Sequence, residues 1–396
     1  MQERHVVLGV TGSIAAYKAV DLASKLTQAG VAVHVVMTES ATKLVGPASF
    51  RAITGLPVST DLFELTNPYA IEHVSLADAA DALVIAPATA NVIAKIAAGI
   101  SDDLLTCTAL ATRAPLMIAP AMHAAMWENA ATQMNVKTLR ERGIKFVGPA
   151  VGRLASGGWG NGRFAPVIDI LGEALRILGQ KGDLARCRMV VSAAGTREPI
   201  DSVRFLGNRS TGRMGYAIAE AARDRGADVT LVTGPTELAR PTGMTVVEVE
   251  TAAEMLEAVS AATSEADALI MAAAVADYAP RQRTDGKLKK AETQLLLECD
   301  RTADVLASVA GPKVRVGFAA ETDGVIENAT RKLRDKRLDL IVANHVGEPE
   351  SGFASPQNRC IFLDADAGRE DLPLLAKREV ADRLLDRIGK LLTGAR

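Results

Sequence analysis

The sequence predicts an α/β protein with two doubly wound domains, each built on a mostly parallel, Rossmann-like sheet. Two different glycine-punctuated strand–turn–helix openings occur, HVVLGVTGSIAAYK at 5–18 and MVVSAAGTREPIDSVRFLGNRSTGRMG at 189–215. The chain of 396 residues is too long for one compact core. Its residues are 48% hydrophobic but only 4% aromatic, which suits parallel strands buried on both faces. Two such openings indicate two phosphorylated ligands and therefore two reactions.

The first half alternates strands and helices, as expected for a flavodoxin-like domain. Ser13 is expected to cap the first helix, and Gly30 to end it. The glycine-rich stretch 148–166 lies inside this series, which favours a lid over a ligand rather than an interdomain linker. The expected elements, in chain order, are strand 5–10, helix 14–28, strand 31–37, strand 82–88, helix 91–98, helix 103–112, strand 116–119, strand 145–147 and helix 167–178.

A polar stretch at 179–188 separates the two halves, and we place the domain boundary between residues 186 and 187. The expected domains are therefore 1–186 and 187–396. In sheets of this kind, ligands bind at the carboxyl ends of the strands. The second half is expected to contain strand 189–192, helix 214–225, strands 229–233, 269–273, 314–318 and 340–343, and an amphipathic helix at 377–392.

The composition excludes several classes of function. A net charge of −2 gives no basic signature for nucleic acid or an anionic membrane. The segment MQERHVV runs directly into a strand without a signal-peptide pattern, and no stretch is apolar enough to span a membrane. The four cysteines are far apart and form no zinc pattern, so they indicate free thiols in the cytoplasm.

The first strand–turn–helix has the features of a phosphate site. Gly9, Gly12 and Ser13 allow the backbone and a helix N-terminus to approach a phosphate. Thr38 and Ser40 follow the second strand at the same sheet edge and add hydroxyl donors. The turn is neither a dinucleotide G-x-G-x-x-G nor a Walker motif, so a single phosphate of a mononucleotide fits best.

Two strands of this half end in Ala-Pro-Ala, at 86–88 and 119–121. Small residues there leave room for a flat ring beside the backbone. His73, in AIEHVSL, is a further candidate for the same site. A lone histidine is more often a hydrogen-bonded structural residue, and the residues alone do not decide between the two interpretations.

These motifs resemble known families. GVTGSIAAYK, IEHVSLA, APATANVIAKIAAGISDDLL and PAMHAAMW resemble the homo-oligomeric flavin-containing cysteine decarboxylases. SAAGTREPIDSVRFLGNRSTGRMG, AAAVADY, KLKK, VGFAAET and KLRDKRLDLIVAN resemble the phosphopantothenate–cysteine ligases. Together, over almost the whole chain, they resemble the bacterial bifunctional decarboxylase–ligases of coenzyme A biosynthesis.

The resemblance implies a ligase that activates 4′-phosphopantothenate with CTP and Mg²⁺, forms an acyl cytidylate and transfers the acyl group to cysteine. It implies Asn208 and Lys287 as catalytic residues, Arg204 and Asn208 as substrate contacts, and Mg²⁺ held through the CTP phosphates rather than by assigned protein ligands. Lys289 is a further candidate cation, and for Lys289 and Lys290 a solvated basic face is an equal alternative. The implied CTP-binding residues are Met271, Ala272, Ala273, Asp277, Lys287, Ala303, Asp304, Val305, Leu306, Phe318, Lys332 and Lys336.

The resemblance also implies an FMN-dependent decarboxylase that converts 4′-phosphopantothenoylcysteine to 4′-phosphopantetheine. FMN supplies the electron sink that loss of CO₂ requires. His73 and His123 are the implied catalytic residues, and Met122 is a substrate contact. The implied FMN-binding residues are Gly12, Ser13, Thr38, Ser40, Ala88, Thr89 and Asn91.

Two positions depart from the common pattern of the decarboxylases. The family usually has Asn where this chain has His123, and a lid cysteine where the nearest match is Ser156. A hydroxyl is a much poorer acid than a thiol, so the source of the proton for the final reduction is open.

Three alternatives to this function remain. An oxidative cysteine decarboxylase would release an enethiol, but such relatives lack a ligase half. A non-enzymatic regulatory subunit would have an incomplete site. An NAD(P)-dependent reductase would need the missing dinucleotide motif. The resemblance further implies a homo-oligomer, with trimers of the flavin domain and dimers of the ligase domain combining into a dodecamer.

Overall fold

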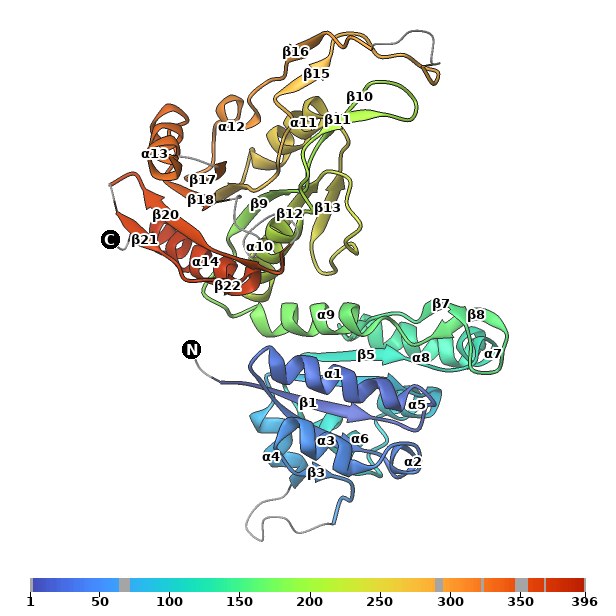
Figure 1. Cartoon of the computed structure of the whole chain (residues 1–396). Coiled ribbons are helices and arrows are strands. Elements are labelled where there is room, and N and C mark those ends of the chain that lie inside the picture. The colour runs from blue at the N-terminus through green and yellow to red at the C-terminus, as the bar shows by residue number, and fades with distance from the viewer. Residues whose placement is uncertain are drawn as a thin grey trace. The chain divides into compact units, whose positions relative to one another are not determined.

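The computed structural model describes residues 3–63, 72–288, 295–321, 324–345, 355–366 and 368–394. The chain forms two compact units, Met1–Leu178 and Gly179–Arg396, and each is considered by itself (Figure 1). The segment 179–186 belongs to the second unit, where Leu184 is buried in the core and Asp183 pairs with Arg225.

The first unit alternates strands and helices as expected. Its elements are β1 (Arg4–Val10), α1 (Ala16–Gln28), β2 (Val31–Met37), α2 (Glu39–Thr42), α3 (Pro47–Thr54), β3 (Val58–Ser59), α4 (Glu72–Ala79), β4 (Ala82–Ala88), α5 (Ala90–Ala98), α6 (Leu104–Ala111), β5 (Leu116–Pro120), α7 (Ala124–Glu128), α8 (Ala130–Glu141), β6 (Lys145–Phe146), β7 (Ala150–Arg153), β8 (Trp159–Arg163) and α9 (Val167–Gly179).

The main sheet of this unit is parallel throughout, in the order β3-β2-β1-β4-β5-β6. Without the two-residue edge strand β3, this is the flavodoxin order, with its topological switch point between β1 and β4. One face of the sheet packs on α1, α3 and α9, and the other on α5, α6 and α8. The predicted α/β class and doubly wound sheet are therefore confirmed for this unit.

One local prediction for this unit is wrong. Ser13 does not cap α1: the N-cap is Ala15, and the carbonyl of Ser13 accepts from Ala16 in a tight turn before the helix. Turn and cap use the same small polar residues, so the sequence pattern does not separate them. The glycine-rich stretch, which the sequence predicts to be a lid, contains β7 and β8, and these strands pair as an antiparallel hairpin.

The second unit contains β9 (Arg188–Ala193), β10 (Arg197–Pro199), β11 (Phe205–Gly207), α10 (Arg213–Asp224), β12 (Asp228–Thr233), β13 (Thr245–Glu248), α11 (Ala252–Thr263), β14 (Ala268–Met271), β15 (Tyr278–Pro280), β16 (Cys299–Arg301), α12 (Val305–Ser308), β17 (Val314–Glu321), α13 (Val325–Asp335), β18 (Leu340–His345), β19 (Gln357–Asn358), β20 (Cys360–Asp364), β21 (Arg369–Asp371), β22 (Leu375–Ala376) and α14 (Lys377–Thr393).

Its main sheet has the order β13-β12-β9-β14-β17-β18-β20-β21. The first six strands are parallel in the Rossmann order, and β20 and β21 add an antiparallel edge. Helices α10 and α14 cover one face, while α11, α12 and α13 cover the other (Figure 1). The switch point lies between β9 and β14, which is where a ligand of this sheet is expected.

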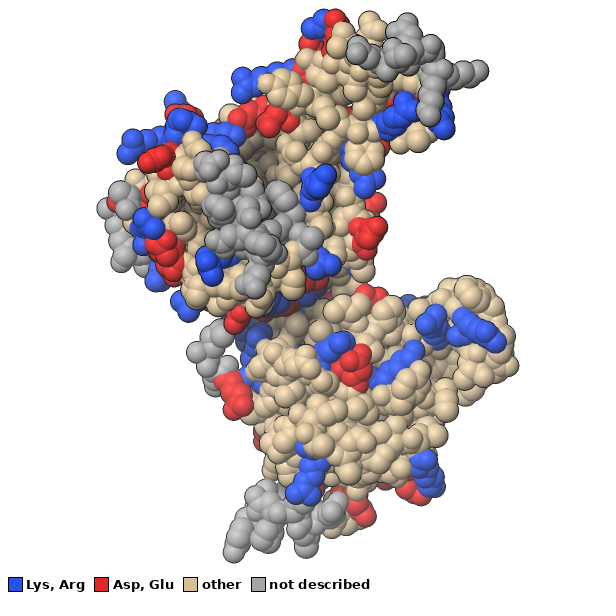
Figure 2. All heavy atoms as spheres, viewed as in Figure 1, with Lys and Arg blue, Asp and Glu red and all other residues tan. Residues whose placement is uncertain are grey.

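Within the described residues, every helix is too short or too polar to cross a bilayer. On the face shown in Figure 2, basic and acidic side chains are interspersed over both units.

Candidate functional sites

In the first unit, Thr11 joins the two strands that border the switch point. Its hydroxyl donates to the carbonyl of Pro87 at 2.7 Å and accepts from the N–H of Thr89 at 3.0 Å. The turn after β1 and the start of α5 are thereby fixed beside each other. Thr89 also caps α5, with its hydroxyl accepting from the N–H of Val92 at 3.4 Å. A turn and a helix N-terminus therefore meet at one edge, as an anion site requires.

The turn after β1 also lies close to the end of β2. A Cβ atom on Gly12 would lie 2.4 Å from the Cβ of Ser40, so only glycine fits there without displacement. The hydroxyl of Thr38 is buried without a hydrogen-bond partner among the described residues. A buried hydroxyl without a partner is costly, and a bound phosphate oxygen would satisfy it. The residues at this edge thus fit the phosphate of a mononucleotide.

The two Ala-Pro-Ala strand ends are neighbours. Ala88 at the end of β4 pairs with Pro120 at the end of β5, and the N–H of Ala121 donates to the carbonyl of Ala88 at 3.0 Å. Ala88 itself is fully buried, whereas Asn91, in the first turn of α5, is exposed.

The hairpin β7–β8 is anchored next to the predicted substrate residues. The N–H of Met122 donates to the carbonyl of Gly162 at 3.0 Å, and a Cβ on Gly162 would lie 2.3 Å from the Met122 carbonyl oxygen. Nδ1 of His123 accepts from the N–H of Ala125 at 3.3 Å and caps α7. Because Nδ1 accepts, the neutral ring carries its proton on Nε2.

Two predicted residues lie apart from this arrangement. His73 is half-buried in the first turn of α4, and its neighbour Glu72 accepts a hydrogen bond from Ser59 on β3. No hydrogen bond between described residues links His73 to the turn after β1. Ser156 is exposed in the turn of the β7–β8 hairpin, which the Leu154–Gly158 backbone hydrogen bond closes at 2.8 Å.

The second unit contains a cavity of about 680 Å³ at the carboxyl edge of its sheet. The cavity lies over the switch point, between the start of α10 and the ends of β14, β17 and β18. All the predicted CTP-binding residues except Lys287 line it, and so does Asn208. Lys289 and Lys290 lie outside the described residues.

Hydrogen bonds hold the segment that follows β14 in place. Ser192 accepts from the N–H of Ala273 at 3.1 Å, and Thr196 accepts from the N–H of Ala276 at 2.9 Å. The side-chain amide of Asn208 donates to the carbonyl oxygens of Ala274 and Val275 at 3.2 and 3.0 Å. Both amide hydrogens of Asn208 are thus used within the protein, which leaves its oxygen to face a ligand as an acceptor.

The cavity carries cations opposite this segment. Lys332 in the last turn of α13 and Lys336, its C-cap, lie one helical turn apart, and both line the cavity. Nζ of Lys336 lies 2.8 Å from the carboxylate of Asp304, which also caps α12. Burial raises the pKa of Asp304, but Lys336 and the backbone N–H groups of α12 outweigh burial and lower it overall.

Arg204 and Lys287 do not line the cavity. Both lie near Asp201 instead: Arg204 is 3.4 Å from its carboxylate, and the N–H of Leu288 donates to the same carboxylate at 3.2 Å. Lys287 is exposed.

Sequence reasoning missed nine polar residues that line the cavity: Arg209, Ser210, Thr211, Arg213, Arg301, Thr302, Asn344, Asn358 and Lys377. The Oδ1 atom of Asn344 is buried without a partner among the described residues, which indicates a ligand donor at this end. The motif IVAN that contains Asn344 could have flagged it, whereas nothing in the sequence around Lys377 indicates a site. No group of three or more His, Cys, Asp or Glu side chains in the described part of the chain is placed to hold a metal.

Comparisons with known proteins agree with two such units. Residues 1–178 match the family described as Flavoprotein, and residues 184–392 match the DNA/pantothenate metabolism flavoprotein C-terminal domain. The fold of the two units, their candidate sites and these two family matches together identify the chain as a two-domain flavoprotein.

The relatives are full-length matches. The chain is 43% identical to the coenzyme A biosynthesis bifunctional protein CoaBC of Bacillus subtilis, over 99% of this chain and 98% of that protein. It is 45% identical to CoaBC of Mycobacterium tuberculosis, over 99% and 97% of the two chains. Among solved structures, the chain resembles the crystal structure of the C-terminal domain of a CoaBC protein. The two sequences are 40% identical, the TM-score is 0.47, and the match covers 54% of this chain and all of that one.

The chain belongs to the CoaBC family of bifunctional coenzyme A biosynthesis proteins. The expected function, a bifunctional enzyme with a flavoprotein decarboxylase half and a ligase half, is thereby confirmed.

Proposed function

We propose that the second unit joins 4′-phosphopantothenate to cysteine with CTP, and that the first unit decarboxylates the product to 4′-phosphopantetheine with FMN. The observation that carries the ligase assignment is the cavity at the switch point, where the predicted CTP-binding residues meet. The two reactions follow each other, because the product of the ligase is the substrate of the decarboxylase.

The ligase step transfers a cytidylyl group between anions. A carboxylate oxygen of phosphopantothenate attacks the α-phosphorus of CTP, the α–β phosphoanhydride bond breaks, and pyrophosphate leaves. The amine of cysteine then attacks the acyl carbon, forms the amide and releases CMP. Lys332 and Lys336 stabilise the negative charge on the phosphates, together with Mg²⁺ bound through CTP.

Asn208 has a specific role in this scheme. Because its amide nitrogen donates to the carbonyl oxygens of Ala274 and Val275, the side chain of Asn208 offers its oxygen as an acceptor for a ligand of the cavity that it lines. A neutral side chain fits here, because it orients the substrate without competing as a nucleophile.

In the first unit, Gly12, Ser13, Thr38, Ser40 and Thr89 hold the phosphate of FMN, and Ala88 and Asn91 lie beside its ring. When bound, FMN provides the electron sink that decarboxylation of a cysteine carboxylate requires. His73 moves the proton of the substrate, while Met122 and His123 hold the substrate beneath the hairpin. The tautomer of His123 leaves Nε2–H to donate to a substrate carboxylate or amide oxygen.

The positions of Arg204 and Lys287 support an oligomer. Both residues are implied in substrate binding, yet neither lines the cavity of its own chain. We infer that ligase units dimerise and that these two residues reach the cavity of the other copy. Trimers of the flavin unit, combined with these dimers, give a dodecamer in the cytoplasm.

The test is a reconstitution with the full chain. The purified protein is expected to be yellow, and the bound flavin is identified as FMN by mass spectrometry after release. With phosphopantothenate, cysteine, CTP and Mg²⁺, it should form CMP, pyrophosphate, CO₂ and 4′-phosphopantetheine. A colourless protein that consumes no CTP would contradict the proposal. A product two hydrogens short of 4′-phosphopantetheine would instead support the oxidative decarboxylase.

A further inference from the structure

One end of the cavity in the second unit is formed by residues with no assigned role. Arg213 is the first residue of α10, and Lys377 is the first residue of α14. Both line the cavity, together with Asn344 and Asn358. Lys377 is only 7% exposed, which is unusual for a lysine.

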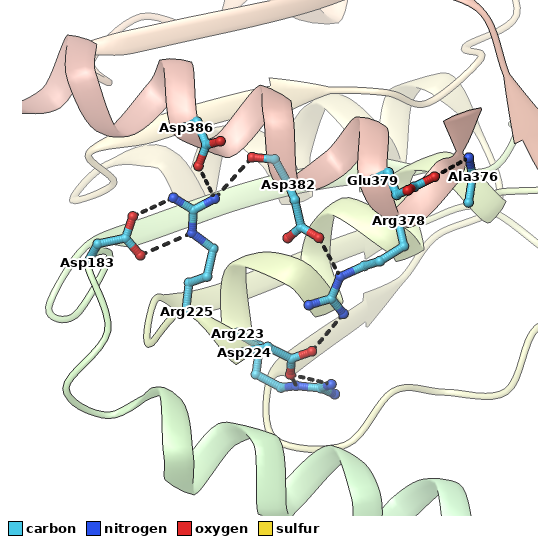
Figure 3. A network of polar contacts seen from close by, with 9 residues as sticks. All are labelled: Asp183, Arg223, Asp224, Arg225, Ala376, Arg378, Glu379, Asp382 and Asp386. Carbon is cyan, nitrogen blue, oxygen red and sulfur yellow. Dashed lines mark hydrogen bonds and ion pairs between the residues drawn. The ribbon is translucent and has the colours of Figure 1, made fainter. Parts of the chain in front are cut away.

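The start of α14 is held in place by a network of ion pairs (Figure 3). Arg378, the next residue after Lys377, contacts Asp224 at 2.7 Å and Asp382 at 3.2 Å. The carboxylate of Asp224 is also paired with Arg223 at 2.7 Å. Arg225 forms ion pairs with both Asp183 and Asp386, and Asp386 lies one helical turn after Asp382 on α14. The network therefore fixes the start of α14 against α10, although it does not itself reach the cavity.

Two cations at two helix N-termini line this cavity end, and such an arrangement favours an anionic ligand. Burial, and then the guanidinium of Arg213, lower the pKa of Lys377 to about 8, and the thiol of Cys360 on β20 only partly offsets them. The buried Oδ1 of Asn344 has no partner among the described residues, which indicates that a ligand donates a hydrogen bond at this end; because a phosphate dianion only accepts, the donor belongs to another group of the same ligand.

We propose that Arg213 and Lys377 form a binding site for a phosphoryl group of the ligand that fills this cavity. The proposal deepens the ligase function and rests on it. Two sources supply such a group, the triphosphate of CTP and the phosphate of phosphopantothenate. Both are phosphate dianions or polyanions, which Arg and Lys bind through charge-assisted hydrogen bonds.

The experiment uses the full-length protein and calorimetric titration. Wild type, Lys377→Met and Arg213→Gln are titrated with inorganic pyrophosphate, CTP, cytidine, phosphopantothenate and pantothenate. Lys390→Met is the matched control, since Lys390 is an exposed lysine on the same helix. Both cavity variants should weaken pyrophosphate and one of the two substrates by about tenfold or more. Cytidine and pantothenate should bind as they do to wild type, and the affected substrate identifies the source of the phosphoryl group.

A second readout separates binding from a structural role. Because the pKa of Lys377 is lowered to about 8, part of its population is neutral near pH 8, and an anion should draw a proton onto it. Titration in two buffers with different heats of ionisation should show proton uptake by wild type and Lys390→Met, and less uptake by Lys377→Met. Arg213 and Cys360 are the neighbours that would share the titration, so Cys360→Ser should keep the uptake.

The outcomes are distinct. Lys377→Met that binds pyrophosphate, CTP and phosphopantothenate within twofold of wild type would overturn the assignment. A wild type that binds neither CTP nor phosphopantothenate would overturn the ligase function and this site with it. Thermal unfolding checks the fold: at pH 7 Lys377→Met should be at least as stable as wild type, because a buried lysine with a lowered pKa destabilises the folded state wherever it is charged.

Discussion

Nζ of Lys336 lies 2.8 Å from a carboxylate oxygen of Asp304, so two residues that line the same cavity neutralise each other. A ligand phosphate that approaches Lys336 must therefore compete with Asp304. The same carboxylate caps α12, so it also positions the predicted nucleotide segment 303–306.

Replacing Asp304 with Asn should tighten CTP binding when Mg²⁺ is absent. Asn keeps the helix cap but removes the negative charge, which frees Lys336 for the triphosphate. We expect a decrease in Kd of about threefold in EDTA, typical of a partly exposed ion pair. Asp300→Asn is the control, because Asp300 pairs with Arg281 and does not line the cavity. Weaker binding by Asp304→Asn in EDTA would contradict this role.

Gly12→Ala should lower the flavin content of the purified protein. The new Cβ would lie 2.4 Å from Ser40, so the turn after β1 must shift and lose its contacts with the phosphate. Gly46→Ala is the matched control, because a Cβ at Gly46 meets nothing within 4 Å. The flavin-to-protein absorbance ratio measures the effect, and an unchanged ratio in Gly12→Ala would remove this turn from the FMN site.

His73→Asn should stop the anaerobic bleaching of the flavin by phosphopantothenoylcysteine. If His73 moves the substrate proton, its loss should slow the oxidative half by about a hundredfold or more. His123→Asn is the comparison: Asn also caps a helix and is the usual residue of the family there, so bleaching should persist. Bleaching of His73→Asn at the wild-type rate would assign the proton to another group.

Lys287→Gln should abolish release of pyrophosphate from CTP and phosphopantothenate. Losing one positioned cation in such a reaction typically costs on the order of a hundredfold. Lys313→Gln serves as the control, since Lys313 is 77% exposed and pairs with Asp267. If dimerisation delivers Lys287 to the other copy, mixing Lys287→Gln with Asn208→Asp chains should restore part of the activity. If Lys287→Gln turns over within threefold of the wild-type rate, Lys287 is not a catalytic residue of the ligase.

Arg378→Gln should destabilise the second unit. Asp224 is 2% exposed, and after the change it would lose its ion pair with Arg378 and keep the one with Arg223. We expect a loss of about 1–2 kcal/mol in the free energy of unfolding, or about 2–8 °C in Tm. Arg383→Gln, at an exposed position of the same helix, should leave Tm unchanged. An equal Tm for both variants would show that the network does not contribute to stability.

The two sheets and most of the cavity could be predicted because parallel strands bring their carboxyl ends to one edge. Ala88 and Pro120, and the segments after β14 and β17, follow from that rule alone. The proximity of Arg213 to Lys377 could not be predicted from that rule. Their proximity depends on the antiparallel return through β20 and β21, which no local pattern specifies.

The β7–β8 hairpin could not be predicted from the sequence for a different reason. Its glycines resemble an irregular loop, yet Gly162 is required by the contact of β8 with the carbonyl of Met122, which is a tertiary constraint. Likewise, the hydroxyls of Ser13 and Thr89 look equivalent in the sequence, and only the fold makes Thr89 a helix cap and Ser13 part of a turn.

The anchored base of the β7–β8 hairpin sets a limit on how the flavin unit opens to its substrate. Gly162 is pressed against Met122, while residues 155–159 are exposed. The contact at Gly162 leaves little room for movement at the base of the hairpin, so we expect any bending to occur in the few residues at the tip. If the substrate binds beneath the hairpin, as proposed above, changes in the length of the tip should alter the rate of substrate entry and leave the shape of the pocket intact.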